Sequence, residues 1–390
     1  MDHLKNAISL LKSNKDGLRC PKKWRSQYPT NVLATLDLPE VNGGLGLPLQ
    51  EMIKVFRIAG EIDLTLRDAI GIGHASLLLE QSRGAESFAD YLREVGGGNY
   101  FIGIAMTEPS AGSDIRSLET VGKNEHGQVV INGRKKYILR LMEATHFIVL
   151  FKCENTSSLS LAILPRDSEG ISYKNIPKSA FPLQTFGEIS FNNVKVGEQS
   201  LIGSWGGGMP IIVNHLTKWR ILTTAALLGC ASGALSLAIE WMRTREAFGG
   251  PIGRFSHLQQ DVASYAGRIH MIWIFLSEIA RSIDSGNEKY LESALCKAEG
   301  GDLAVQVVRW SVKTLGARGI CEETDLMQRL LDLEAMTIAD GASDLLRMQA
   351  ARGLTGEEIY ESGLSRSRTV NRVGGKALNY MLFPDAIDEY

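Results

Sequence analysis

The stretch Ala105-Met106-Thr107-Glu108-Pro109-Ser110-Ala111-Gly112-Ser113-Asp114 concentrates hydroxyl side chains and small residues. It follows the apolar run 100–104, which predicts a strand, so the stretch begins where a strand ends. Hydroxyl groups and closely spaced backbone N–H groups in such a turn can cradle a phosphate or the polar edge of a ring. From composition alone, an ordinary loop of turn-forming residues explains the stretch equally well.

The composition of the whole chain argues against several classes of protein. Its 390 residues are 44% apolar, and this length predicts two or three domains. The 42 basic and 44 acidic residues nearly cancel, which argues against a nucleic-acid binder. The five cysteines form no CxxC pair and the seven histidines show no ligand spacing, so we expect no metal site. We also expect no leader segment and no membrane span, and therefore a cytoplasmic protein.

Two glycine runs, at 96–98 and 206–208, separate zones of different periodicity. Helical spacing of apolar residues marks the first and the last zone, and short β-branched or apolar runs mark the zone between them. We therefore predict an N-terminal helical domain (1–99), a middle β domain (100–205), a C-terminal helical bundle (206–363) and a mixed tail (364–390). The helices are expected to include 52–59, 75–79, 218–243, 258–282, 290–315 and 345–354.

The middle zone should form a small barrel or sandwich, because several short strands fall within about 100 residues. Residues 146–152 and 159–164 are two of these strands. Asn132-Gly133 stands between two strand-like runs and predicts a hairpin with a type I′ turn, since that turn needs positive φ at both central residues. The pair Gly71 and Gly73 lacks a preceding strand and a third glycine, and it predicts a helix start rather than a dinucleotide loop.

Several segments in chain order resemble the signatures of the acyl-CoA dehydrogenase family. Residues 105–114 resemble its flavin-binding signature. The other matches are Leu38-Pro39-Glu40 with Gly43-Gly44-Leu45-Gly46, Asn132-Gly133 with Lys135 and Tyr137, Arg245-Glu246-Ala247-Phe248-Gly249 with Ile252 and Phe255, and Gly316 and Gly319 with the run 338–352. The resemblance covers about residues 36–354. It implies an α+β fold with an N-terminal helical domain, a central β-barrel and a C-terminal four-helix bundle.

The resemblance also implies FAD between barrel and bundle, in a homodimer or homotetramer. Arg245 and Phe248 would then reach the flavin of a neighbouring subunit, and Gly316 would let the backbone approach the adenosine part. The cofactor-binding positions that carry over are Met106, Thr107, Gly112, Ser113, Tyr137, Ile138, Leu139, Arg245, Phe248, Phe255, Gly316, Ala342 and Asp344.

The family's reaction is the α,β-desaturation of an acyl thioester, in which a carboxylate removes the α-proton and flavin N5 accepts the β-hydride. At the place of the usual base this chain has Asp340, whose reach is shorter by ~1.5 Å. Trp219 occupies the other family position for the base and cannot act as one. The resemblance therefore implies Asp340 as the catalytic base, with Arg220, Gly341 and Arg352 contacting the substrate.

Departures from the family pattern lie around the same cofactor. Leu139 and Ala342 replace threonines, Ser256 replaces a glutamine and Ala317 a glycine. They suggest a specialised biosynthetic member that acts on an acyl group carried by CoA or by an acyl carrier protein. Basic residues among the first 25 could steer an acidic carrier protein, or could form a solvated helix face. The electron acceptor would be an electron-transfer flavoprotein or oxygen.

Two alternatives remain open at this point. One keeps the fold but changes the chemistry to a flavin oxidase or monooxygenase, because the nitroalkane oxidase branch has an aspartate at the base position. The other is a structural relative that has lost its flavin. The colour of the protein separates the last alternative from the rest, and the oxygen reactivity of the reduced flavin separates the first.

Overall fold

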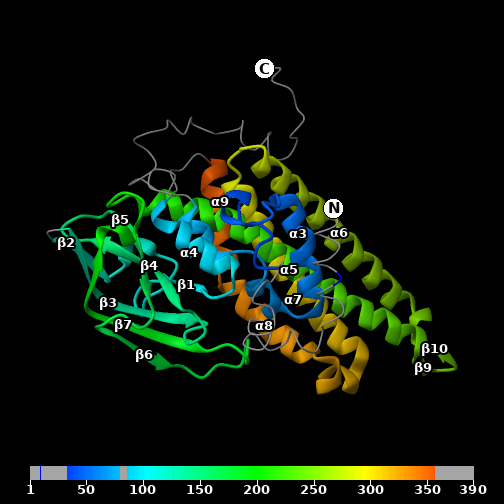
Figure 1. Ribbon diagram of the computed structural model, residues 1–390. Helices are drawn as coiled ribbons and strands as arrows, with labels where there is room; N and C mark the ends of the chain where they lie inside the picture. The colour runs from blue at the N-terminus through cyan, green and yellow to red at the C-terminus, as the bar shows by residue number, and fades with distance from the viewer. Residues whose placement is uncertain (1–8, 10–32, 80–85, 126, 356–390) are drawn as a thin grey trace.

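The structure is a computed structural model that describes residues 9, 33–79, 86–125 and 127–355. Helices of the N-terminal part lie against a long helical bundle, and a β-barrel lies at one end of that bundle (Figure 1). This arrangement confirms the predicted α+β fold. The expected basic N-terminal face and the tail 364–390 lie outside the described residues.

The N-terminal part consists of α3 (Leu49–Ile62) and α4 (Glu86–Gly96), with the 3-10 turns η1 (Glu40–Asn42), η2 (Leu64–Ala69) and η3 (Gly73–Leu78) around them. One face of α3 is buried and includes Met52, Phe56 and Ala59. The helix predicted at 52–59 is therefore confirmed, whereas 75–79 forms 3-10 rather than α turns. The element η3 begins at Gly73, as expected for a helix start.

Eight strands form the middle domain in the order β6-β7-β3-β2-β4-β5-β8, with β1 paired to β4. Side chains from both long strands, such as Ile131 and Ile189, are fully buried in its core. The strands predicted at 146–152 and 159–164 are confirmed as β4 and β5. The bounds are β1 Ile102–Ala105, β2 Val121–Glu125, β3 Gln128–Leu139, β4 His146–Cys153, β5 Leu159–Pro165, β6 Ile171–Asn175, β7 Phe186–Gly197 and β8 Leu201–Ile202.

The hairpin turn predicted at Asn132-Gly133 is wrong, because both residues lie inside β3. The ladder between β2 and β3 ends where Glu125 pairs with Gln128, several residues before Asn132. Gly133 serves a different purpose there. A Cβ on Gly133 would stand 2.5 Å from the Thr120 backbone, and the β3–β7 register shifts next to it. Glycine in a strand interior often marks such a bulge or close approach.

The bundle contains α5 (Gly208–Thr244), α6 (Ser256–Asp284), α7 (Tyr290–Leu315), α8 (Leu326–Ile338) and α9 (Ser343–Thr355). All four predicted helices of this region are present, and α7 has the predicted bounds. Helix α8 was not predicted. A short ribbon, β9 (Glu246–Ala247) and β10 (Gly250–Pro251), joins α5 to α6, and the 3-10 turns η6 (Ile252–Arg254), η7 (Gly316–Ile320) and η8 (Glu322–Thr324) complete the connections.

Helix α5 lies at the centre of the bundle. It is long and apolar enough to cross a membrane by length and composition alone. However, 78% of its most apolar window is buried inside the protein, which is the pattern of a core helix. Its neighbour α3 packs at very short range, since a Cβ on Gly229 would stand 1.9 Å from the Arg57 carbonyl oxygen.

Candidate active site

The loop that follows β1 is anchored by a buried ion pair. Lys135 of β3 donates from Nζ to Glu108 Oε1 at 2.7 Å and to the Met106 carbonyl at 2.8 Å. The side chains of Lys135 and Glu108 are 0% and 1% exposed. Glu108 also accepts hydrogen bonds from the backbone N–H groups of Glu119 and Thr120. This network ties the loop 106–113 to strand β3 and to the residues just before β2.

Burial shifts the pKa values of this pair in opposite directions. Burial raises the pKa of Glu108, but the hydrogen bond and the charge of Lys135 outweigh it and leave that pKa below its usual value. Burial lowers the pKa of Lys135 to about 8, against the opposing influence of Glu108. The sequence identified Lys135 as a motif position but not the partner role of Glu108, because a loop glutamate gives no sign that it will be buried.

The outer side of the loop suits a pyrophosphate. In the described part of the chain, the backbone N–H groups of Gly112 and Ser113 have no backbone partner. Tyr137 has a left-handed backbone (φ 65°), is 53% exposed and stacks on Phe186. These unpaired donors and this accessible ring fit the phosphate and ring portions of FAD.

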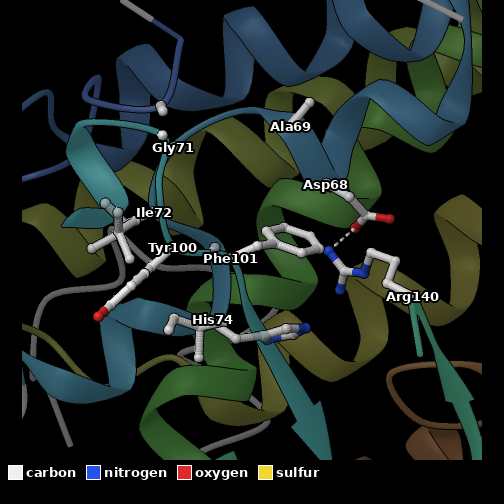
Figure 2. Close-up of a pocket in the computed structure, with 13 residues that line it drawn as sticks. Asp68, Ala69, Gly71, Ile72, His74, Tyr100, Phe101 and Arg140 are labelled. Atoms are coloured by element: carbon white, nitrogen blue, oxygen red, sulfur yellow. Dashed lines mark ion pairs between the residues drawn. The ribbon is translucent and has the colours of Figure 1, made fainter. Parts of the chain in front are cut away.

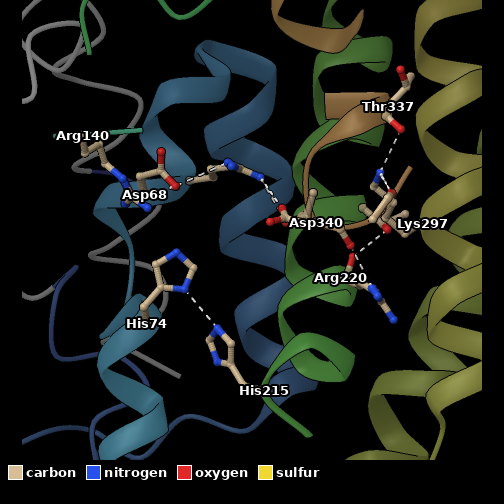
Figure 3. Close-up of polar contacts among 12 residues, drawn as sticks. Asp68, His74, Arg140, His215, Arg220, Lys297, Thr337 and Asp340 are labelled. Atoms are coloured by element: carbon tan, nitrogen blue, oxygen red, sulfur yellow. Dashed lines mark hydrogen bonds and ion pairs between the residues drawn. The ribbon is translucent and has the colours of Figure 1, made fainter. Parts of the chain in front are cut away.

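The loop between α8 and α9 carries Asp340 and is tied down by two buried cations (Figure 3). Arg220 Nε donates to the Asp340 carbonyl at 3.0 Å, and Lys297 Nζ donates to the Gly341 carbonyl at 2.6 Å. Asp340 and Gly341 both have positive φ, 59° and 108°. For Asp340 this is an uncommon conformation that costs free energy, so its position is set by the tethers.

The carboxylate of Asp340 is held on one side only. Its Oδ2 accepts from Arg67 Nη1 at 3.2 Å and from Thr223 Oγ1 at 3.3 Å. Its Oδ1 accepts no hydrogen bond from the described residues, and the side chain is 17% exposed. Burial works against its charge, but nearby cations, Arg67 foremost, outweigh burial and hold the pKa of Asp340 below its usual value.

Arg67 connects Asp340 to two further charged residues, Asp68 and Arg140, that the sequence did not predict as part of the site. Arg67 Nε lies 3.4 Å from Asp68 Oδ1, and Arg140 Nη1 lies 3.4 Å from the same oxygen. We call the following six residues the buried charge cluster: Arg67, Asp68, Arg140, Arg220, Lys297 and Asp340. Arg67 and Asp68 are charges within an apolar run, and this was the signal available in the sequence.

A histidine pair lies beside the cluster. His74 Nδ1 and His215 Nε2 are 3.0 Å apart, and Ser76 Oγ lies 2.9 Å from the other ring nitrogen of His215. Burial lowers the pKa of His215 to about 4 and that of His74 well below its usual value. Both rings are therefore neutral at pH 7.

Arg245, Phe248 and Phe255 lie together at the β9–β10 ribbon, at the end of the bundle farthest from the barrel (Figure 1). Phe248 is 88% exposed. Within one chain the structure therefore does not bring these residues to the loop 106–113.

The remaining predicted positions have separate surroundings. Ile138 is buried in the barrel core, whereas Leu139 packs against the helical core. Gly316 has φ 61°, and a Cβ there would meet no atom within 4 Å. The carbonyl of Ala342 caps α9 through Leu346, Asp344 is fully exposed, and Arg352 is exposed on α9.

Arg220 is buried and tethers the Asp340 loop, and its guanidinium lies 5.5 Å from the Tyr290 ring. Its contact with substrate stays a prediction, as do the roles of Gly341 and Arg352. No group of three or more metal-ligating side chains occurs among the described residues.

The chain is similar to known proteins along most of its length. Residues 103–194 match the sequence model of the acyl-CoA dehydrogenase middle domain, and residues 206–355 match that of the C-terminal domain. Isovaleryl-CoA dehydrogenase of Solanum tuberosum is 26% identical over 346 residues, which are 86% of this chain and 82% of that protein.

Solved structures share the fold. The complex of a Mycobacterium smegmatis glutaryl-CoA dehydrogenase with FADH2 has a TM-score of 0.83 at 18% identity, covering 91% of this chain and 94% of that one. A prolyl acyl carrier protein oxidase has a TM-score of 0.82 at 21% identity, covering 90% and 97%. The two matched sequence models together span more than half of the chain, which therefore belongs to the acyl-CoA dehydrogenase family of flavin-dependent oxidoreductases.

Proposed function

We propose that this protein is an FAD-dependent dehydrogenase that desaturates an acyl thioester between its α- and β-carbons, with Asp340 as the base. The observation that carries the proposal is the state of the Asp340 carboxylate. One oxygen is fixed by Arg67 and Thr223, and the other has no partner among the described residues. A general base needs such a fixed carboxylate with one free oxygen.

The residues around the loop 106–113 would hold the cofactor. Gly112 and Ser113 offer N–H donors for the pyrophosphate, and Tyr137 offers an accessible ring for the flavin face. When bound, FAD supplies an acceptor for the two electrons and the hydrogen that leave the β-carbon. Glu108 and Lys135 stay beneath the loop and keep its backbone in place.

The proton and electrons of the step balance as follows. The α C–H bond breaks, its proton goes to Oδ1 of Asp340, and its electron pair forms the new carbon–carbon double bond. The β C–H bond breaks with its electron pair, which leaves as hydride. The lowered pKa keeps Asp340 ionised at neutral pH, and it also makes the carboxylate a weak base. A substrate with an acidic α-carbon would therefore be favoured.

Asp340→Asn tests the proposal, with Asp332→Asn as the matched control. Asp332 is a buried aspartate of α8, and it accepts a hydrogen bond from the Phe181 N–H. Flavin bleaching should be followed anaerobically in single turnover. Asp340→Asn should keep its flavin and slow bleaching by about 1000-fold, within the range of losses seen when a positioned base is removed. Asp332→Asn should bleach like the parent. A parental rate in Asp340→Asn would show that the base lies elsewhere.

The proposal includes a CoA-bound or a carrier-bound acyl group. Curated relatives such as isovaleryl-CoA dehydrogenase are named for CoA thioesters, and a structural neighbour named as a prolyl acyl carrier protein oxidase supports a carrier-bound group with oxygen as the acceptor. Reoxidation of the bleached enzyme by dissolved oxygen, with product still bound, tests whether oxygen is the electron acceptor. Reoxidation within seconds supports an oxidase, whereas reoxidation over many minutes supports a dehydrogenase that needs a protein acceptor.

A further inference from the structure

We propose that the acyl group oxidised at this site carries a negative charge, such as a carboxylate, and that Arg140 and Arg67 bind it. The proposal rests on the proposed function and specifies its substrate class. It follows from the charges, the unpaired donors and the space in the buried charge cluster.

The cluster has an excess of positive charge. Four cationic side chains, Arg67, Arg140, Arg220 and Lys297, share the site with two carboxylates, which leaves it two positive charges in excess. The next acids are engaged elsewhere: Asp302 pairs with Arg347 at 2.6 Å, and Glu143 accepts from the Thr185 N–H. Glu143 acts on Arg140 and Asp302 acts on Lys297 only in part, because each has its own partner, and the neutral histidines beside the cluster add no charge.

Two of the cations keep unused donors. Arg140 Nε and Arg220 Nη1 are buried and have no hydrogen-bond partner among the described residues, whereas Arg67 Nε has only its 3.4 Å ion-pair contact with Asp68 Oδ1. The three residues are only 4–7% exposed. A buried donor on a charged group that lacks a partner is costly, and an excess buried charge is more so. A bound anion would remove both costs at once.

Arg140 lies next to a small cavity. It follows β3 directly after Tyr137, Ile138 and Leu139, the segment that family resemblance assigns to the flavin face. Its side chain, together with Asp68, His74 and Phe101, lines a cavity of about 30 Å³ (Figure 2). That volume accommodates a water or one carboxylate oxygen.

A chain of ion pairs links Asp340 to Arg67 and Arg140. Asp340 contacts Arg67, Arg67 contacts Asp68, and Asp68 contacts Arg140, so Arg140 lies two ion pairs beyond Arg67. A charge at the far end of a short acyl chain would therefore meet Arg67 or Arg140 while the α-carbon lies at Asp340. An apolar acyl chain would instead bury methylenes against unpaired guanidinium groups, which is unfavourable.

The test compares matched thioesters on the flavin-loaded enzyme. Succinyl-, glutaryl- and adipoyl-CoA are each paired with the thioester in which an isopropyl group replaces the carboxylate. Binding is measured by calorimetry under anaerobic conditions, and flavin bleaching is measured separately. We expect at least one carboxylate to bind about 10- to 100-fold tighter than its neutral partner, as for hydrogen bonds to charged groups.

Arg140→Met should remove most of this preference, and Arg140→Lys should recover part of it. The matched control is Arg329→Met, which removes a partly buried arginine that is paired with Asp325 away from the cluster. This variant should lose stability without changing the preference. Equal binding of both partners at all three lengths, or a preference that survives in Arg140→Met, overturns the proposal.

Binding and bleaching distinguish the two levels of the inference. If a carboxylate binds in an Arg140-dependent way but bleaches no flavin, the anion site stands and the desaturation proposal fails. If the neutral partners bind and bleach as well as the carboxylates, desaturation stands and the anion site fails.

Discussion

Lys135→Met should destabilise the barrel and loosen the flavin-binding loop, because it leaves the Glu108 carboxylate buried without its cation. The pair is almost fully enclosed, with the two side chains 0% and 1% exposed and 2.7 Å between Nζ and Oε1. Breaking such a buried pair from one side costs about 3–5 kcal/mol. Two backbone N–H donors, from Glu119 and Thr120, still contact Glu108, so we expect the lower end, about 3 kcal/mol.

The double variant Glu108→Gln/Lys135→Met separates this cause from a simple packing defect. It removes both charges, while the glutamine carbonyl can still accept one of the backbone hydrogen bonds. Since replacing both partners of a buried pair is often close to neutral, the double variant should be within about 1 kcal/mol of the parent. Lys123→Met is the control, because Lys123 is a half-exposed lysine of the adjacent strand β2 and its loss should not be measurable.

The assay is urea unfolding of the flavin-loaded protein, followed by tryptophan fluorescence, with flavin content measured on the same samples. Lys135→Met should also lose flavin, since Lys135 ties down the Met106 carbonyl at the start of the loop. At pH 5 part of the loss should be recovered, because an unpaired buried Glu108 would take up a proton. A loss below about 1 kcal/mol in Lys135→Met, or a double variant no better than the single one, would refute the reasoning.

Three further predictions concern the cofactor, the assembly and the histidine pair. Ser113→Glu should lower flavin content severely by setting a charge against the pyrophosphate, while Ser110→Glu at the exposed turn keeps more of it. The flavin-loaded protein should be a dimer or larger by light scattering, since Phe248 lies far from the loop of its own chain, and a flavinated monomer would contradict this. The folded-state pKa of His215 is about 4 against 6.5 unfolded, so its contribution to stability is lost as pH falls from 6.5 to 4. His215→Gln should reduce that pH dependence of unfolding by up to about 3 kcal/mol.

Local patterns predicted the elements well where one periodicity dominates. Helix α7 begins and ends at Tyr290 and Leu315 as expected, because its small and apolar residues recur at helical spacing throughout. The same approach failed at Asn132-Gly133, where a pair typical of turns instead accommodates the backbone of Thr120, the residue before β2. That close approach depends on the sheet and is invisible in the sequence.

The active site likewise has residues that the sequence predicted and residues that only the fold brings together. The positions around Asp340 and the loop 106–113 could be carried over from family signatures, because those residues are close together in the sequence. The buried charge cluster could not, since Arg67, Arg140 and Asp340 come from three separate parts of the chain. A charged residue in a sequence is expected at the surface, and only the fold shows that these are enclosed together.

The position of Arg67 connects the base to the proposed substrate charge. In the structure Arg67 gives Asp340 its closest opposite charge, and this is a main reason why the carboxylate is a weak base. An anionic acyl group bound at Arg67 would share that guanidinium and add a negative charge nearby, and both effects raise the pKa of a carboxylate. Asp340 would then become more basic only when the correct substrate is bound. A neutral acyl group would leave the Arg67–Asp340 pair intact, so the arrangement selects against neutral substrates in the proton-transfer step as well as in binding.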